Sequence, residues 1–231
     1  MNRSNVIFHY RMESLEKLFG GTARVRLMRL FLFNPGTLFT TATLVKRAKI
    51  NVESIRRELS HLLKAGFIKR RIATYSSGTR LKGRIVRKRT PGFSFNAHFP
   101  YLHPLRNLLI EATPLQSDIL LRRLNRAGKL KLVVISGLLI QEPDSRLDLL
   151  VVGDRLNKGL LDRIVHTLES ELGKELRYTV FESGDFIYRL NVYDKLIRDV
   201  FDYPHQKILD RMELPLLVET YRDLSPNRII T

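Results

Sequence analysis

Residues 51–66, NVESIRRELSHLLKAG, carry the pattern that most restricts how this chain can fold. Five apolar residues recur there at helical spacing: Val52, Ile55, Leu59, Leu62 and Leu63. This spacing predicts an amphipathic helix with one face in a core. Asn51 is suited to cap the start of this helix, and Gly66 is suited to end it. The opposite face is polar and includes Ser54, Arg56, Arg57, Ser60 and His61.

The predicted helix lies at the start of a segment without acidic residues. No Asp or Glu occurs between Glu58 and Glu111, whereas eleven Lys and Arg residues do. Residues 1–97 hold 21 Lys and Arg against four Asp and Glu, and residues 98–231 hold 19 of each, so the whole net charge of +17 lies in the first part. Cations this dense repel one another unless anions are near, and a polyphosphate supplies them. We therefore expect two domains, 1–97 and 98–231, the first of which faces a polyanion; the alternative is a basic, solvated surface without a partner.

The elements around residues 51–66 suggest a small helical core followed by a hairpin. Helices are expected near residues 23–33 and 41–50, with a tight turn at 49–51 before the next helix. After Gly66 the chain becomes extended from Phe67, and Ser76–Gly78 is typical of a turn between two strands. Residues 67–89 are therefore predicted to form a basic two-stranded wing.

Residues 43–71, TLVKRAKINVESIRRELSHLLKAGFIKRR, resemble the winged helix-turn-helix of bacterial and archaeal transcription regulators. The likeness lies in Ala48, the short turn after it, the apolar stripe, and the Leu-x-x-Ala-Gly-Phe-Ile exit at residues 62–68. It implies that the 51–66 helix enters the major groove and that the wing holds phosphates or lies in the minor groove. The expected partner is double-stranded DNA, bound by a homodimer. A plain helical hairpin is the alternative.

The resemblance and the charges together give a set of candidate DNA-binding residues. These are Ser54, Arg56, Arg57, Ser60, His61, Lys69, Arg70, Arg71, Arg80, Lys82, Arg84, Arg87, Lys88 and Arg89. The basic segment lacks the aromatic residues that single-strand binders interleave with their cations, which favours a duplex.

The second half has the order strand, strand, helix, strand over residues 129–183, which predicts an α+β domain. The stretch from Leu132 to Asp154, with the following helix and strand, resembles the nucleotidyltransferase fold. Catalytic members of that family have a Gly-Ser pair and then two metal-binding carboxylates separated by one residue. Here the small pair is reversed, as Ser136-Gly137, and Arg146 stands at the first carboxylate position with Asp148 at the second. A guanidinium at a metal position opposes metal binding, so we expect a degenerate, non-catalytic domain that needs no metal or cofactor.

The fold class expected is thus α+β, with an N-terminal winged helix-turn-helix and a C-terminal nucleotidyltransferase-like α/β domain. Asp148 is expected to pair with Arg146 or to cap a loop. Ser136, Gly137, Arg146 and Asp148 are candidates for binding a phosphate or nucleotide effector, and dimerisation is the other expected role of this domain. A metal-dependent nucleotidyltransferase and an antitoxin-like module that binds a partner protein are alternatives. The chain has no Cys and no apolar run of membrane-spanning length, so a cytoplasmic location without a membrane partner is expected.

Overall fold

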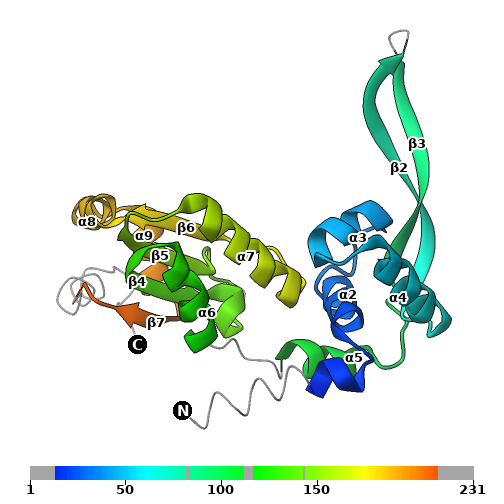
Figure 1. Ribbon diagram of the computed structural model, residues 1–231, viewed down its shortest axis with the longest axis horizontal. Helices are drawn as coiled ribbons and strands as arrows, with labels where there is room; N and C mark the ends of the chain where they lie inside the picture. Colours follow the sequence, from blue (N-terminus) through cyan, green and yellow to red (C-terminus); the bar gives the residue numbers. More distant parts are fainter. Residues whose placement is uncertain (1–13, 82–83, 112–116, 143, 213–231) are drawn as a thin grey trace, which may run out of the picture. The chain divides into compact units, whose positions relative to one another are not determined.

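The computed structural model describes residues 14–81, 84–111, 117–142 and 144–212; for 73–81, 84–88 and 111 only the backbone is described. Over these residues the chain is a mixed α+β protein with two sheets. It divides into two compact units, residues 1–113 with 167–174 and residues 114–166 with 175–231 (Figure 1). The first unit extends beyond the expected boundary at residue 97, because Leu109 is buried in its core and Phe99 and Leu102 pack against it. None of the helices in these ranges is both long enough and apolar enough to cross a membrane.

Three helices form the core of the first unit, and all three are where the sequence predicts them. They are α2 (Thr22–Phe33), α3 (Thr41–Ala48) and α4 (Val52–Lys64). The side chains of Leu27, Phe31, Leu44 and Ile55 are fully buried among them. α5 (Leu102–Arg106) and the π-helical turn η1 (Asn107–Glu111) also belong to this unit.

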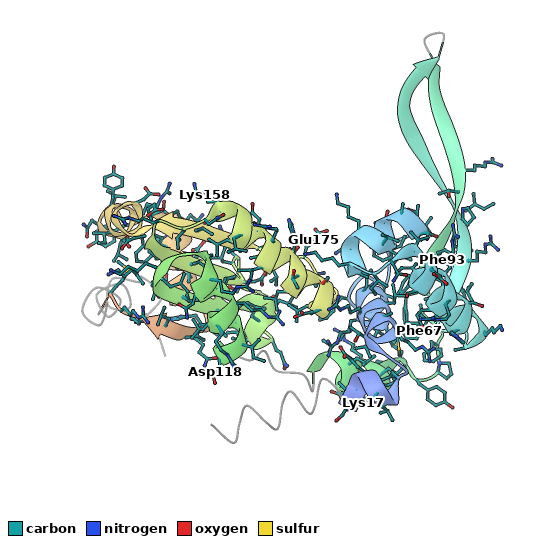
Figure 2. All side chains as sticks on the ribbon, in the orientation of Figure 1. Lys17, Phe67, Phe93, Asp118, Lys158 and Glu175 are labelled. Carbon is teal, nitrogen blue, oxygen red and sulfur yellow. The ribbon has the colours of Figure 1, made fainter. Side chains whose placement is uncertain are left out.

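A long antiparallel hairpin follows α4 and extends away from the three helices (Figure 1). It consists of β2 (Ile68–Leu81) and β3 (Arg84–Phe95), and the short strand β1 (Phe39–Thr40) pairs with β3 to give the sheet order β1-β3-β2. Phe67 and Phe93 lie at the base of the hairpin (Figure 2). The turn predicted at Ser76–Gly78 is wrong: these residues lie within β2, pairing continues to Leu81 opposite Arg84, and a register shift falls between Ser76 and Arg80.

The second unit is built on a four-stranded sheet with the order β6-β5-β4-β7. β4 pairs antiparallel with both β5 and β7, and β5 pairs parallel with β6. The strands are β4 (Lys129–Ser136), β5 (Leu149–Asp154), β6 (Tyr178–Glu182) and β7 (His205–Asp210). Its other described elements are α6 (Ser117–Leu124), the 3-10 turns η2 (Asn125–Ala127) and η3 (Gly137–Ile140), α8 (Ser183–Asn191) and α9 (Lys195–Asp202). The helix α7 (Lys158–Leu172) is divided, because residues 158–166 belong to the second unit and residues 167–172 to the first. The core holds residues of β4 and β5 together with Phe186, Leu190 and Val200.

Candidate functional site

Five of the candidate DNA-binding residues lie on α4, on the face of the helix opposite the core. Arg56, Arg57, Ser60 and His61 are exposed, and Ser54 is half-buried. The helix starts where the sequence predicts, because the side chain of Asn51 accepts a hydrogen bond from the Ser54 N–H at 2.8 Å. Gly66 follows the helix with a φ of +72°, a left-handed conformation that favours glycine, and turns the chain into β2. Local sequence thus fixes both ends of this face.

The same helix carries a buried acid, Glu58, that was not predicted from the sequence. The Glu58 side chain is 5% exposed, and its Oε2 lies 2.6 Å from the Nε of Arg24 on α2. Its Oε1 lies 3.5 Å from the Nε of Arg57, whose own side chain is 63% exposed. Glu58 therefore ties α4 to α2 from the core side and also contacts a candidate reading residue. Its position as the last acid before the acid-free segment was the available signal.

The core stripe predicted for α4 needs one correction. Val52 is 43% exposed, whereas Ile55, Leu59 and Leu62 are buried as predicted and Leu63 is partly buried. The buried arc of the helix runs through Glu58 and does not reach Val52. The first turn of α4 consequently projects further from the core than the apolar spacing indicates.

The base of the hairpin adds a second group of cations to this unit. Lys69, Arg70, Arg71 and Arg89 are exposed, and among the described residues none of them has a hydrogen-bond or ion-pair partner. The remaining predicted cations of the wing are Arg80, Arg84, Arg87 and Lys88, whose backbones lie in β2 and β3 but whose side chains are outside the described residues, and Lys82, which is outside them entirely. The described cations have no carboxylate to neutralise them and are available to an anion.

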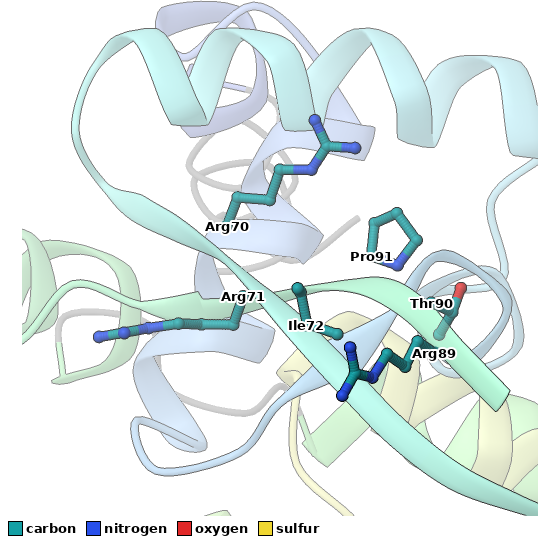
Figure 3. A pocket seen from close by; sticks show the side chains of 6 residues that line it. All are labelled: Arg70, Arg71, Ile72, Arg89, Thr90 and Pro91. Atoms are coloured by element: carbon teal, nitrogen blue, oxygen red, sulfur yellow. The ribbon is translucent and has the colours of Figure 1, made fainter. Parts of the chain in front are cut away.

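A hollow of about 530 Å³ lies at this part of the hairpin (Figure 3). The residues lining it are Arg70, Arg71, Ile72, Arg89, Thr90 and Pro91. Ile72 and Pro91 are opposite each other in the strand register, and Ile72 is 70% exposed. The hollow therefore combines guanidinium groups with an apolar surface.

In the second unit, Ser136, Gly137 and Asp148 lie together, but their polar groups are satisfied within the chain. Asp148 is 1% exposed. Its Oδ1 accepts hydrogen bonds from the Leu138 N–H at 2.8 Å and the Arg177 Nη2 at 2.9 Å. Its Oδ2 accepts from the Arg177 N–H at 2.8 Å and the Arg177 Nε at 3.1 Å. Four donors saturate the acceptor sites of a carboxylate, so no acceptor of Asp148 is left for another group.

Arg177 holds the Asp148 carboxylate, a role that no pattern in the sequence indicates. The hydrogen bond from Arg177 to Asp148 raises the pKa of the Arg177 guanidinium above its ordinary value. Gly137 permits this arrangement: its φ is +54°, and a Cβ there would overlap Asp148 Oδ1. The Ser136 hydroxyl donates to the Leu147 carbonyl.

The partner predicted for Asp148 is only half right. Asp148 caps the loop at Leu138, as one of the two expectations held, but it does not pair with Arg146. The Arg146 side chain is 61% exposed, and its Nη1 lies 3.2 Å from the Oδ2 of Asp199 on α9. The four residues proposed as an effector site are therefore not all brought together, because Arg146 is engaged with another element.

No protein-family model, curated protein or solved structure matches this chain. Two features remain as grounds for a function. One is the set of exposed cations on α4 and at the hairpin base, of which Arg56, Lys69, Arg70, Arg71 and Arg89 have no partner among the described residues. The other is the internally satisfied Asp148 cluster in the second unit.

Proposed function

We propose that this protein is a transcription regulator that binds double-stranded DNA through a winged helix-turn-helix formed by residues 22–95. The observation that carries the proposal is the exposed face of α4, with Arg56, Arg57, Ser60 and His61, followed directly by a hairpin with unpaired cations. The order α2, β1, α3, α4, β2, β3 and the sheet order β1-β3-β2 support it. The three-residue connection from α3 to α4, with Lys49 left-handed at a φ of +53°, supports it as well.

In this mechanism the N-terminal half of α4 enters the major groove. Arg57 is the candidate for forked hydrogen bonds to a guanine, because a contact with the buried Glu58 carboxylate restrains its guanidinium. Arg56 has no partner among the described residues and is the candidate for a flanking phosphate. Lys69, Arg70, Arg71 and Arg89 supply further phosphate contacts and hence affinity without sequence choice.

The second unit serves the regulator without catalysis in this proposal, by forming a homodimer or sensing an effector. Support comes from Asp148, whose carboxylate is saturated by Arg177 and Leu138. A homodimer would present two α4 helices to a two-fold DNA site.

The decisive experiment is selection of binding sites from genomic duplex DNA by the full chain at physiological salt. We expect an enriched, two-fold sequence motif. Arg57→Ala should then cost roughly 1–3 kcal/mol and relax the preference at one base pair of each half-site. Lys158→Ala, which removes one exposed cation from the second unit, is the charge-matched control and should leave the motif unchanged. Recovery of no motif would refute sequence-specific regulation.

The dependence of affinity on salt tests the hairpin separately. Replacing Arg70, Arg71 and Arg89 by Gln should flatten the slope of log K against log salt concentration by up to about 2.7, since each phosphate contact contributes about 0.9. The selected motif should stay the same, because phosphate contacts carry no base information. An unchanged slope would mean that these three arginines do not meet phosphates.

A further inference from the structure

Two apolar residues of the hairpin, Ile72 and Pro91, are exposed to solvent at positions where a strand of a soluble protein ordinarily has polar residues. Ile72 on β2 lies opposite Pro91 on β3, and directly opposed residues in an antiparallel pair share a face. The same face holds Ile68 opposite Phe95 nearer the helices, where they are 2% and 6% exposed. Because side chains alternate along a strand, this face passes outward through Arg70 and Phe93 to Ile72 and Pro91, and Ile72 is 70% exposed.

Cations surround this apolar pair. Arg70 precedes Ile72 on the same face, and Arg89 follows Pro91 outward on the same face of the partner strand. Figure 3 shows Arg70, Ile72, Pro91 and Arg89 around the hollow, with the Arg71 side chain extending in another direction. Neither Arg70 nor Arg89 has a partner among the described residues. The surface is therefore apolar at its centre and positively charged on two sides.

This chemistry matches the minor groove of duplex DNA better than a peptide strand added beside β3. Deoxyribose rings give the groove apolar walls, and phosphates run along both of its edges. A peptide adding as a strand beside β3 would need a backbone donor there, but β1 pairs with β3 only at Phe93 and Gly92, and the next residue outward, Pro91, has no N–H. The segment from residue 59 to residue 110 has no acid, so the charge also favours a polyanion.

We propose that Ile72 and Pro91 enter the minor groove as an apolar wedge that bends the bound duplex, with Arg70 and Arg89 on the phosphates at either side. Apolar side chains inserted there partly unstack a base step and bend DNA by roughly 20–90°. Pyrimidine–purine steps unstack most readily, so the wedge adds a preference for a TA or CA step flanking the bases that α4 reads. The inference rests on the proposed function, since it requires that the protein bind duplex DNA.

The test measures the bend by energy transfer between dyes at the two ends of the selected duplex, with and without the full chain. Ile72→Thr keeps the β-branched shape and the charge while it removes the apolar tip. We expect the bend and the flanking-step preference to be lost, affinity to fall about tenfold, and the salt slope to stay the same. Ile187→Thr, at an exposed isoleucine of α8, is the matched control and should behave as wild type.

The results of this experiment distinguish a failure of the apolar wedge from a failure of DNA binding. Wild type that binds its motif without bending it, or Ile72→Thr with an unchanged bend and step preference, overturns the wedge and leaves DNA binding intact. Wild type that binds no duplex overturns both. A loss of affinity with a changed salt slope would assign the effect to displaced arginines and would also overturn the wedge.

Discussion

The ion pair between Arg24 and Glu58 makes an asymmetric prediction about the stability of the first unit. The Glu58 side chain is 5% exposed, whereas the Arg24 side chain is 28% exposed. When Arg24 is replaced by Leu, Glu58 remains as a buried carboxylate whose one other charged contact among the described residues is with Arg57, at 3.5 Å. When Glu58 is replaced by Leu, Arg24 can turn its guanidinium into water. Both single variants break the same ion pair, but Arg24→Leu leaves a buried, poorly neutralised carboxylate, whereas Glu58→Leu leaves a guanidinium that water can solvate.

The expected magnitudes follow from this difference in exposure. Removing one partner of a buried pair costs about 3–5 kcal/mol when the other charge stays buried, which describes Arg24→Leu. Glu58→Leu forfeits a charge-assisted hydrogen bond but strands no charge and gains apolar contact, so we expect about 1–2 kcal/mol. The double variant should be more stable than Arg24→Leu alone, with a coupling of about 1–3 kcal/mol.

Hydrogen exchange of the full chain, followed by mass spectrometry, reports the opening free energy of α2 and α4 separately from that of the second unit. Arg57→Leu is the control, and it should cost less than about 1 kcal/mol because Arg57 is 63% exposed. Equal costs for Arg24→Leu and Glu58→Leu, or additive effects in the double variant, would refute the view that a stranded buried carboxylate decides the energetics.

The second unit supports two further predictions, both measurable by chemical denaturation. Gly137→Ala should destabilise it by about 2–3 kcal/mol, because a Cβ there is strained at a φ of +54° and displaces the Asp148 carboxylate, whereas Gly184→Ala in α8, where a Cβ meets no atom within 4 Å, should be neutral or stabilising; equal effects would contradict this reasoning. Asp148→Asn should cost about 2–4 kcal/mol, because an amide cannot accept all the donors of Arg177 and Leu138. The hydrogen bond to Asp148 raises the pKa of Arg177, so the stabilisation from this pair is fully present below the ordinary pKa of arginine and is lost only as pH rises through the higher pKa of the folded state. The loss of stability caused by Asp148→Asn should therefore be the same at pH 6 and pH 9. A marked difference between the two pH values would count against this pair.

The helices of the first unit were predictable because their apolar periodicity is local. The stripe from Ile55 to Leu62 determined which side of α4 is buried, and Asn51 and Gly66 determined where it begins and ends. The exposure of Val52 and the burial of Glu58 were not predictable from the same pattern. The burial of Glu58 goes with its ion pair to Arg24, which lies 34 positions earlier in the chain.

Pairing between distant segments explains the other differences between prediction and structure. Ser76–Gly78 has the composition of a turn, but pairing with β3 continues on both sides of it, and Ser77 and Gly78 fall within the register shift between Ser76 and Arg80. In residues 205–210 the alternation of apolar and polar side chains is too weak to predict a strand. They form β7 by pairing with the free edge of β4. The partner of Asp148 was likewise not predictable from local sequence, since Arg177 is 29 positions further along the chain.

The place of β7 in the sheet sets an order of events in folding. β7 pairs with β4 so that Leu132 meets Asp210, 78 positions later. Closing a loop of that length costs conformational entropy before any hydrogen bond of the pair is gained. We therefore expect β4 and β5, which pair across a short connection, to form first and to leave one flank of β4 open. During this interval an apolar strand with an unpaired edge is exposed, so we expect the second unit to be prone to aggregation while it folds.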